Sequence, residues 1–199
     1  MSDDGNDSSQ QTTRTERRRP ARERLLAAVD ELLYREGIAA SGIDRIIDEA
    51  GIAKGTLYGN FRSKDELVDA YLAQRHQHVI ETLDGIARSD GSPQEKVDAV
   101  FDYLAEQVGD EAFRGCAFVI AAAEVPDPDR PPMRWARTNK RGLHDAFVRM
   151  LGGIRGSEAI ADQLCILYDG ALATSAIRPQ AGAVELARRM ARSILDASK

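Results

Sequence analysis

The apolar residues of the chain recur with the spacing of an α-helix along almost its whole length. No long stretch alternates apolar and polar residues, and no Asp-Gly pair stands between two alternating stretches as it does in a β-hairpin. Glycine and proline interrupt the pattern, which predicts helices over about residues 22–36, 53–60, 63–88, 93–108 and 116–124, with further helices up to the C terminus. The sequence therefore predicts an all-α protein.

The composition indicates a soluble globular protein of one or two domains. The chain has 199 residues, of which 43% are hydrophobic and 30% charged. No apolar run approaches the roughly 20 residues that cross a bilayer, and the N terminus lacks a signal peptide, so we expect a cytoplasmic protein without a membrane partner. Residues 1–13 are polar and are expected to form a disordered tail. Cys116 and Cys165 stand far apart, which favours two buried thiols over a disulfide or a zinc site.

Positive charge is concentrated in one short segment of an acidic chain. The net charge is -5, yet six arginines and only two glutamates lie between Arg14 and Arg24. A basic arm of this kind is typical of nucleic-acid binding, and Arg19 and Arg22 are its candidate contacts to DNA. A solvated charged linker is the alternative interpretation of the arm.

Residues 41–61 read SGIDRIIDEAGIAKGTLYGNF and predict two short helices joined by one tight turn. We expect Ser41 to cap the first helix and Gly51 to adopt a positive φ in the turn. Four apolar residues are spaced to form a small core between the helices, namely Ile46, Ala50, Ile52 and Leu57. This pattern is typical of a helix-turn-helix, in which the second helix enters the major groove of DNA.

The second helix of this unit carries side chains that suit contact with DNA. Lys54 can reach a phosphate or a guanine edge, Thr56 can bond to a base, and Tyr58 can donate to a phosphate. Gly55 permits a close approach to the duplex, and Lys64 suits a phosphate. The full set of candidate DNA-binding residues is Arg19, Arg22, Ser41, Lys54, Gly55, Thr56, Tyr58, Asn60 and Lys64. A small helical subdomain without DNA binding is the alternative.

Residues 22–72 resemble the TetR/AcrR family of bacterial transcriptional regulators. The likeness lies in Ala50-Gly51-Ile52-Ala53-Lys54-Gly55-Thr56-Leu57-Tyr58, followed by Phe61, Ser63-Lys64 and Leu67. The resemblance implies about nine helices: a three-helix DNA-binding head, a connecting helix, and a body that binds an effector and forms a homodimer through its last two helices. It also implies repression from a palindromic operator. Ile47, Gly59 and Asn60 depart from the family's usual residues, so the operator sequence cannot be taken from any relative.

We accordingly expect a tail over residues 1–13, a DNA-binding domain over 14–62, and an effector-binding and dimerisation domain over 63–199, of which 63–88 is the connecting helix. The candidate dimer residues are Leu164, Leu167, Ala171, Val184, Ala187, Met190 and Ile194. The candidate pocket residues are the aromatic side chains Phe101, Phe118, Trp135, Phe147 and Tyr168. Each of these residues has an alternative place in the core of a monomer.

Functions of two other kinds are alternatives to a ligand-responsive regulator. An enzyme is disfavoured because His76, His78 and His144 form no catalytic or metal-binding pattern, and no nucleotide-binding or hydrolase motif occurs; we expect neither a metal nor a cofactor. A DNA-binding dimer without small-molecule sensing stays open, as does a regulator that responds to thiol chemistry through Cys116.

Overall fold

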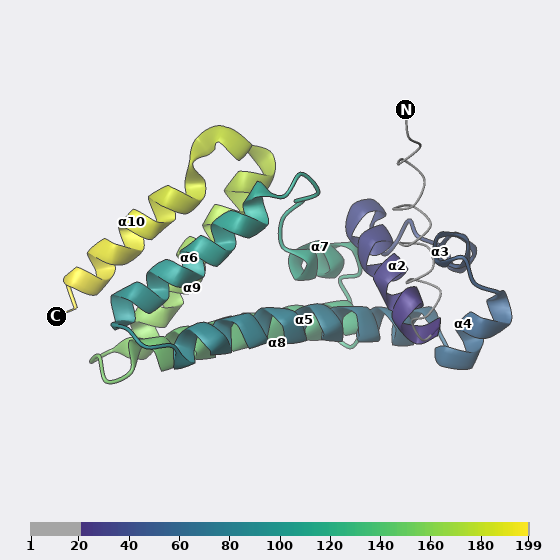
Figure 1. Cartoon of the computed structure of the whole chain (residues 1–199), viewed down its shortest axis with the longest axis horizontal. Coiled ribbons are helices and arrows are strands. Elements are labelled where there is room, and N and C mark those ends of the chain that lie inside the picture. Colours follow the sequence, from purple (N-terminus) through teal and green to yellow (C-terminus); the bar gives the residue numbers. More distant parts are fainter. Residues whose placement is uncertain (1–20, 199) are drawn as a thin grey trace, which may run out of the picture. The chain divides into compact units, whose positions relative to one another are not determined.

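Helix ends in the structure follow the glycines, prolines and capping residues of the sequence. The computed structural model describes residues 21–198, which form nine α-helices and one short 3-10 helix and no strand (Figure 1). In chain order these are α2 (Ala21–Glu36), α3 (Ile43–Ala50), α4 (Lys54–Asn60), α5 (Lys64–Arg88), α6 (Pro93–Gly109), α7 (Ala117–Glu124), α8 (Pro131–Leu151), α9 (Ser157–Ile177), η1 (Pro179–Ala181) and α10 (Ala183–Asp196). The prediction of an all-α protein is confirmed. The expected tail and Arg19 lie outside the described residues.

The described residues fall into two compact units. The first ends at Tyr71 and the second begins at Leu72, so the division lies within α5. One continuous helix therefore belongs to both units, and its extent agrees with the connecting helix expected over residues 63–88. The domain boundary between residues 62 and 63 stays a prediction. No helix in the described part of the chain is both long and apolar enough to span a bilayer.

The first unit, which we call the head, is built on α2. Helix α3 packs on α2, and α4 contacts both. The apolar stripe of α2 and single residues of the shorter helices are buried here: Leu25, Leu26, Val29, Leu32, Leu33, Ile38, Ile46, Leu57 and Phe61. Of the four residues expected between the two short helices, Ile46 and Leu57 are fully buried, whereas Ala50 and Ile52 are half-buried. Burial of such side chains stabilises the head by about 1.5–3 kcal/mol each.

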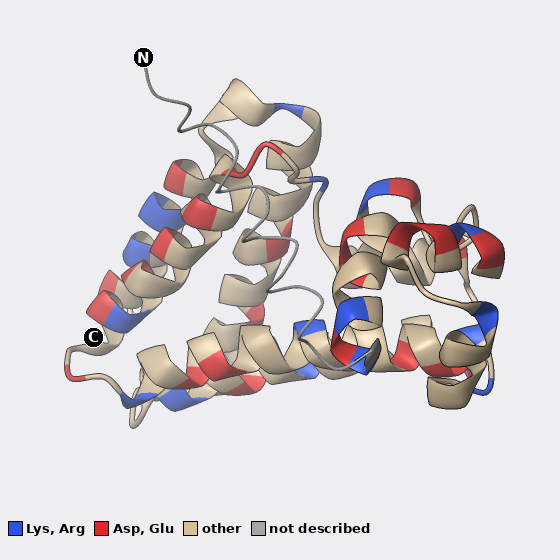
Figure 2. Ribbon diagram, turned by 45° about the vertical axis from the view of Figure 1, so that its right-hand side comes forward, with Lys and Arg blue, Asp and Glu red and all other residues tan. Residues whose placement is uncertain are grey.

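The second unit, which we call the body, has a core made by α6, α8, α9 and α10. Helix α9 packs against α8 on one side and α10 on the other, and α6 lies against α10. Ion pairs join α10 to α6, from Arg188 to Asp102 and from Arg192 to Asp98 at 2.9 Å, and Figure 2 shows opposite charges along these helices. The carboxylate of Asp102 is exposed, so its pair with Arg188 adds little stability. The apolar core therefore stabilises the body.

The start of α3 differs from what the sequence suggested, whereas α6 begins at Pro93, as the sequence predicted. Gly42, not Ser41, is the N-cap of α3, because the Ser41 hydroxyl is buried and donates to the carbonyl oxygen of Gly37 at 2.7 Å. The prediction that Ser41 caps this helix was wrong. At α6, the Ser92 hydroxyl accepts from the backbone N–H of Glu95, and the Glu95 carboxylate accepts from the N–H of Ser92 at 2.7 Å. This reciprocal capping box defines the start of α6.

Candidate nucleic-acid interface

The turn between α3 and α4 depends on one glycine. Gly51 has φ 59° and ψ 40°, the left-handed conformation that glycine adopts without steric cost. Its N–H donates to the carbonyl oxygen of Asp48 at 3.2 Å, and the N–H of Ile52 donates to that of Ile47 at 3.3 Å. The last carbonyls of α3 are thereby satisfied, and the chain turns at once into α4. The expected positive φ at Gly51 is confirmed.

Helix α4, which we call the recognition helix, presents one exposed face. Lys54, Gly55, Tyr58 and Gly59 are exposed, at the spacing of successive helical turns, while Leu57 on the opposite face is fully buried. Neither glycine has an atom within 4 Å of the place where a Cβ would stand. The exposed face therefore combines a cation and a phenol with bare backbone, which lets another molecule come close.

The remaining candidate DNA contacts are engaged within the head. Thr56 and Asn60 are half-buried, and the Asn60 amide donates to the carbonyl oxygen of Thr56 at 2.8 Å. The Lys64 ammonium donates to the carbonyl oxygen of Ile38 at 2.5 Å. The Arg22 guanidinium lies 5.2 Å from the centre of the Phe61 ring. Ser41 is buried, so its side chain belongs to the core of the head and not to the exposed face.

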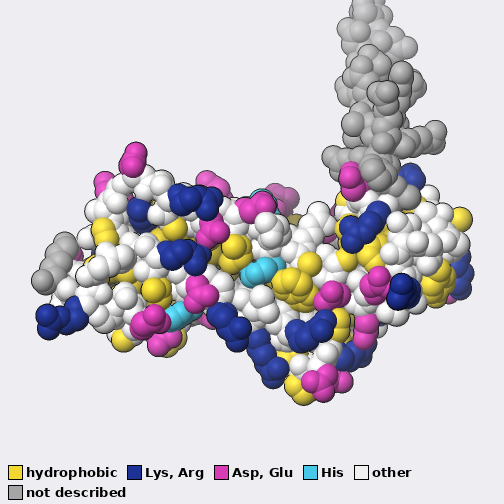
Figure 3. All heavy atoms as spheres, turned by 90° about the horizontal axis from the view of Figure 1, so that it is seen from below, with side chains coloured by type: hydrophobic (Ala, Val, Ile, Leu, Met, Phe, Trp, Pro, Cys, Tyr) yellow, Lys and Arg dark blue, Asp and Glu magenta, His cyan; other side chains and the backbone are white. Residues whose placement is uncertain are grey.

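The described part of the head carries more acidic than basic side chains. Residues 21–71 include seven Lys or Arg and ten Asp or Glu. Arg45 pairs with Glu36 at 3.0 Å and with Glu49 at 2.8 Å, and the Glu36 pKa is lowered chiefly by its hydrogen bond to Arg45. Lys54 is held by Asp44, with 3.2 Å between ammonium and carboxylate. Figure 3 likewise shows basic and acidic side chains interspersed over one face of the molecule. Asp44 was not among the candidate DNA-binding residues predicted from the sequence.

An apolar face of α9 and α10 is exposed in the body. Ile166, Ile177, Leu186 and Met190 are large apolar residues that are at least 48% exposed. A groove of about 390 Å³ runs here, lined by Ile166, Leu167, Gly170, Ala171, Thr174, Arg178, Ala181, Ala183, Leu186, Ala187 and Met190. Four candidate dimer residues line it: Leu167, Ala171, Ala187 and Met190. The other three, Leu164, Val184 and Ile194, lie in or against the core of the body.

The candidate pocket residues divide into two groups. Phe101, Phe147 and Tyr168 belong to the buried core of the body, and burial raises the pKa of the Tyr168 phenol above its ordinary value. Phe118 and Trp135 flank the imidazole of His76, with ring centres 6.4 and 5.3 Å away. His76 Nδ1 lies 3.2 Å from the side-chain oxygen of Asn139, a buried amide. His76 thus brings α5 into this aromatic cluster.

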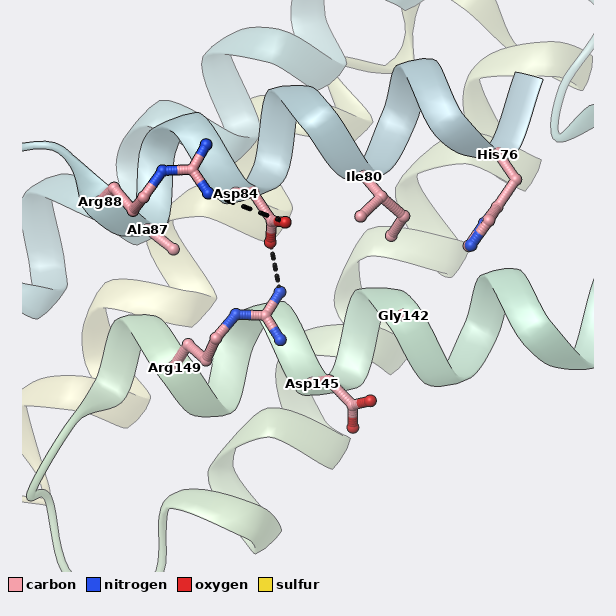
Figure 4. Close-up of a pocket in the computed structure, with 8 residues that line it drawn as sticks. All are labelled: His76, Ile80, Asp84, Ala87, Arg88, Gly142, Asp145 and Arg149. Carbon is pink, nitrogen blue, oxygen red and sulfur yellow. Dashed lines mark hydrogen bonds and ion pairs between the residues drawn. The ribbon is translucent and has the colours of Figure 1, made fainter. Parts of the chain in front are cut away.

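A second groove of the body, of about 590 Å³, lies between α5 and α8 (Figure 4). It is lined by His76, Ile80, Asp84, Ala87 and Arg88 from α5, and by Gly142, Asp145 and Arg149 from α8. Arg149 reaches across to Asp84 at 2.5 Å, and Arg88 lies 3.9 Å from the same carboxylate. No candidate pocket residue lines this groove, because sequence analysis selected aromatic residues and the groove is charged.

The two cysteines are free and half-buried. Burial raises the pKa of the Cys165 thiol to about 12, so this thiol is protonated at neutral pH. Cys116 occupies the N-cap position of α7. No group of three His, Cys, Asp or Glu side chains that could hold a metal ion occurs among residues 21–198.

The comparisons with known proteins agree with this geometry. The model of the family "Bacterial regulatory proteins, tetR family" matches residues 25–71, which span the head from α2 to α5. SCO4454, a TetR-family transcriptional regulator from Streptomyces coelicolor, is 31% identical; the match covers 89% of this chain and 95% of that one, with a TM-score of 0.84. The chain belongs to the TetR family of transcriptional regulators. As a member of this family it is a DNA-binding transcriptional regulator, and the family consists of transcription factors and not enzymes.

Two curated HTH-type relatives match over shorter stretches. FasR of Mycolicibacterium smegmatis, an HTH-type transcriptional activator, is 34% identical over 90 residues, or 42% of this chain and 40% of FasR. NemR of Escherichia coli, an HTH-type transcriptional repressor, is 28% identical over 111 residues, or 53% of this chain and 54% of NemR. The chain thus spans about half the length of these relatives, which include both an activator and a repressor.

Proposed function

We propose that the protein is a ligand-responsive repressor that binds a palindromic operator as a homodimer in the bacterial cytoplasm. The observation that carries this proposal is the exposed face of α4. It holds Lys54 and Tyr58 beside two glycines and is fixed to α3 by the turn at Gly51. A helix so exposed fits the major groove, and the second copy of a dimer would occupy the next groove about 34–36 Å away.

Dimerisation is supported by the apolar face of α9 and α10. Ile166 is 71% exposed and Ile177 is 83% exposed, which is costly for a monomer in water. The residues Gly170, Ala171 and Ala187 along the same groove are small, so helices of a second copy can approach closely. A two-fold dimer uses the same surface on both copies, and this face has the composition for it.

Ligand response is supported by the body, in which the α5–α8 groove and the aromatic cluster around His76 both involve α5. A ligand that prefers one arrangement of α5 changes DNA affinity by its difference in binding free energy between the two arrangements. Repression is the direction that NemR's name gives for that relative, whereas FasR's name gives activation. A thiol response through Cys116 is the second candidate. Cys165 is less suited to it, because burial raises the pKa of its thiol and so disfavours the reactive thiolate.

Selection of genomic fragments by the purified protein tests the proposal. Retained fragments are sequenced at two salt concentrations, and we expect a palindromic motif whose binding weakens steeply as salt rises. A reporter gene downstream of that motif then gives the direction of regulation, and a metabolite panel added to the binding assay gives the effector class. Retention without any shared motif, at either salt concentration, contradicts sequence-specific binding.

A further inference from the structure

The ammonium of Lys54 is already paired before any DNA is present. Its Nζ lies 3.2 Å from Oδ1 of Asp44, which lies in the first turn of α3. Both side chains are well exposed, Lys54 by 62% and Asp44 by 83%. The pair therefore stands at the solvent edge of the recognition helix, where the proposed interface meets DNA.

The neighbouring ion pairs leave Lys54 as the cation of the exposed α4 face that can contribute to DNA affinity. Arg45 on α3 is paired with Glu36 and Glu49, and Arg35 on α2 is paired with Glu31 at 3.0 Å. Helix α4 carries Lys54 as its one charged residue. Non-specific DNA affinity arises from cations that replace counterions on phosphates. A carboxylate beside the one cation of α4 therefore opposes that contribution.

We propose that Asp44 is a specificity-determining residue that acts through Lys54. The carboxylate takes one of the three N–H donors of the ammonium and leaves two for a base edge or a phosphate of the operator. On an operator the pair is kept and orients Lys54. On unrelated DNA, where Lys54 meets phosphates without base contacts, the Asp44 carboxylate is repelled and weakens binding. This inference rests on the proposed function, because it takes the α4 face as the DNA-binding surface.

The experiment compares binding of two duplexes of equal length, the most enriched selected fragment and its shuffled sequence, over a series of salt concentrations. For Asp44→Asn we expect affinity for the shuffled duplex to rise about two- to fivefold, and its salt dependence to steepen by about 0.9 in logarithmic slope. Affinity for the selected fragment stays level or falls. A structural defect of the head lowers both affinities, so this divergence separates the two roles.

Asp48→Asn is the matched control. Asp48 is exposed on the same helix, and no ion pair joins it to another described residue. The Asp48→Asn substitution removes the same charge as Asp44→Asn but leaves the partner of Lys54 in place. The ratio of the affinities for the selected and shuffled duplexes should therefore not change. Asp44→Glu keeps the charge and should restore low affinity for the shuffled duplex. In the Lys54→Gln background, Asp44→Asn should no longer change the ratio.

The possible failures can be told apart. If Asp44→Asn and Asp48→Asn act alike on the shuffled duplex, or if Asp44→Asn raises both affinities equally, the inference is overturned while the proposed interface stands. If Lys54→Gln leaves both affinities unchanged, the α4 face is not the interface. The proposed interface and the inference about Asp44 are then both contradicted. If the selection yields no operator, the proposed function fails, and a duplex of random sequence still decides whether Asp44 restrains Lys54.

Discussion

At the scale of single residues, Gly59 is a glycine at a position of the recognition helix where a side chain would fit. It is exposed, it has no positive φ, and a Cβ built there meets no atom within 4 Å. Gly59→Ala should therefore raise the free energy of unfolding, by up to about 1 kcal/mol, because alanine loses less backbone entropy in a helix. Denaturant unfolding measures this gain. If the face meets DNA backbone closely, operator affinity falls in the same variant.

Gly55→Ala is the control for Gly59→Ala, since it lies one turn earlier on the same exposed face and has equally open space. A lower stability in both variants would show that the exposed face is covered within the protein and is not available to DNA.

Cys165 gives a pH dependence with a defined sign. Its pKa is raised by burial from about 9 to about 12 in the folded protein. Because the unfolded thiol ionises first, the stability that Cys165 contributes is complete below pH 9 and is lost as pH rises towards 12. The free energy of unfolding should thus fall less steeply above pH 9 in Cys165→Ala than in the unaltered chain. Parallel curves for the two proteins would contradict the raised pKa.

At the scale of elements, apolar spacing and glycine positions were enough to predict the helices. The stripe of Leu25, Val29 and Leu32 predicted α2, and Gly51 predicted the turn, since both depend on residues close in sequence. The cap of α3 was not predictable in this way, because the Ser41 hydroxyl can either accept from a backbone N–H of α3 or donate to a carbonyl oxygen, and only the packed head selects donation to Gly37.

The grooves depend on residues far apart in the chain. Asp84 on α5 and Arg149 on α8 form an ion pair. They are 65 positions apart in the chain, so no local sequence pattern predicts their contact. The sequence partly predicts the apolar face of α9, because Ile166, Gly170 and Ile177 fall on one side of the helix. The predicted dimer residues of α9 included Leu167 and Ala171, which line the groove, but also Leu164, a residue equally apolar but turned into the core.

The contact between α5 and α8 depends on the absence of a side chain at Gly142. A Cβ there would stand 2.6 Å from Ile80 Cδ1 and 3.2 Å from His76 Cε1. Gly142→Val should destabilise the protein by about 1–3 kcal/mol, because the added carbons overpack the seam. Gly85→Val, at an open position of α5, is the matched control. Ile80→Ala in the same chain should recover part of the loss, and equal effects of the two valine variants would rule out the close contact.

At the scale of the whole molecule, DNA binding and assembly should be coupled through the face of α9 and α10. Ile166 is 71% exposed and lines the 390 Å³ groove, so a charge there would be buried without a partner in the proposed dimer. Ile166→Glu should therefore yield a monomer by light scattering, with an unfolding midpoint that no longer depends on protein concentration.

The same variant separates assembly from recognition. Each copy keeps its own α4, so binding to half of a palindrome should persist while the gain from the second half disappears, and the salt slope should fall with the number of phosphates contacted. Val119→Glu places the same charge at a residue that is 50% exposed on α7, and it should leave the dimer intact. A dimer that survives Ile166→Glu would move the interface away from α9. A monomer that still binds the whole palindrome at full affinity would show that the two recognition helices act independently.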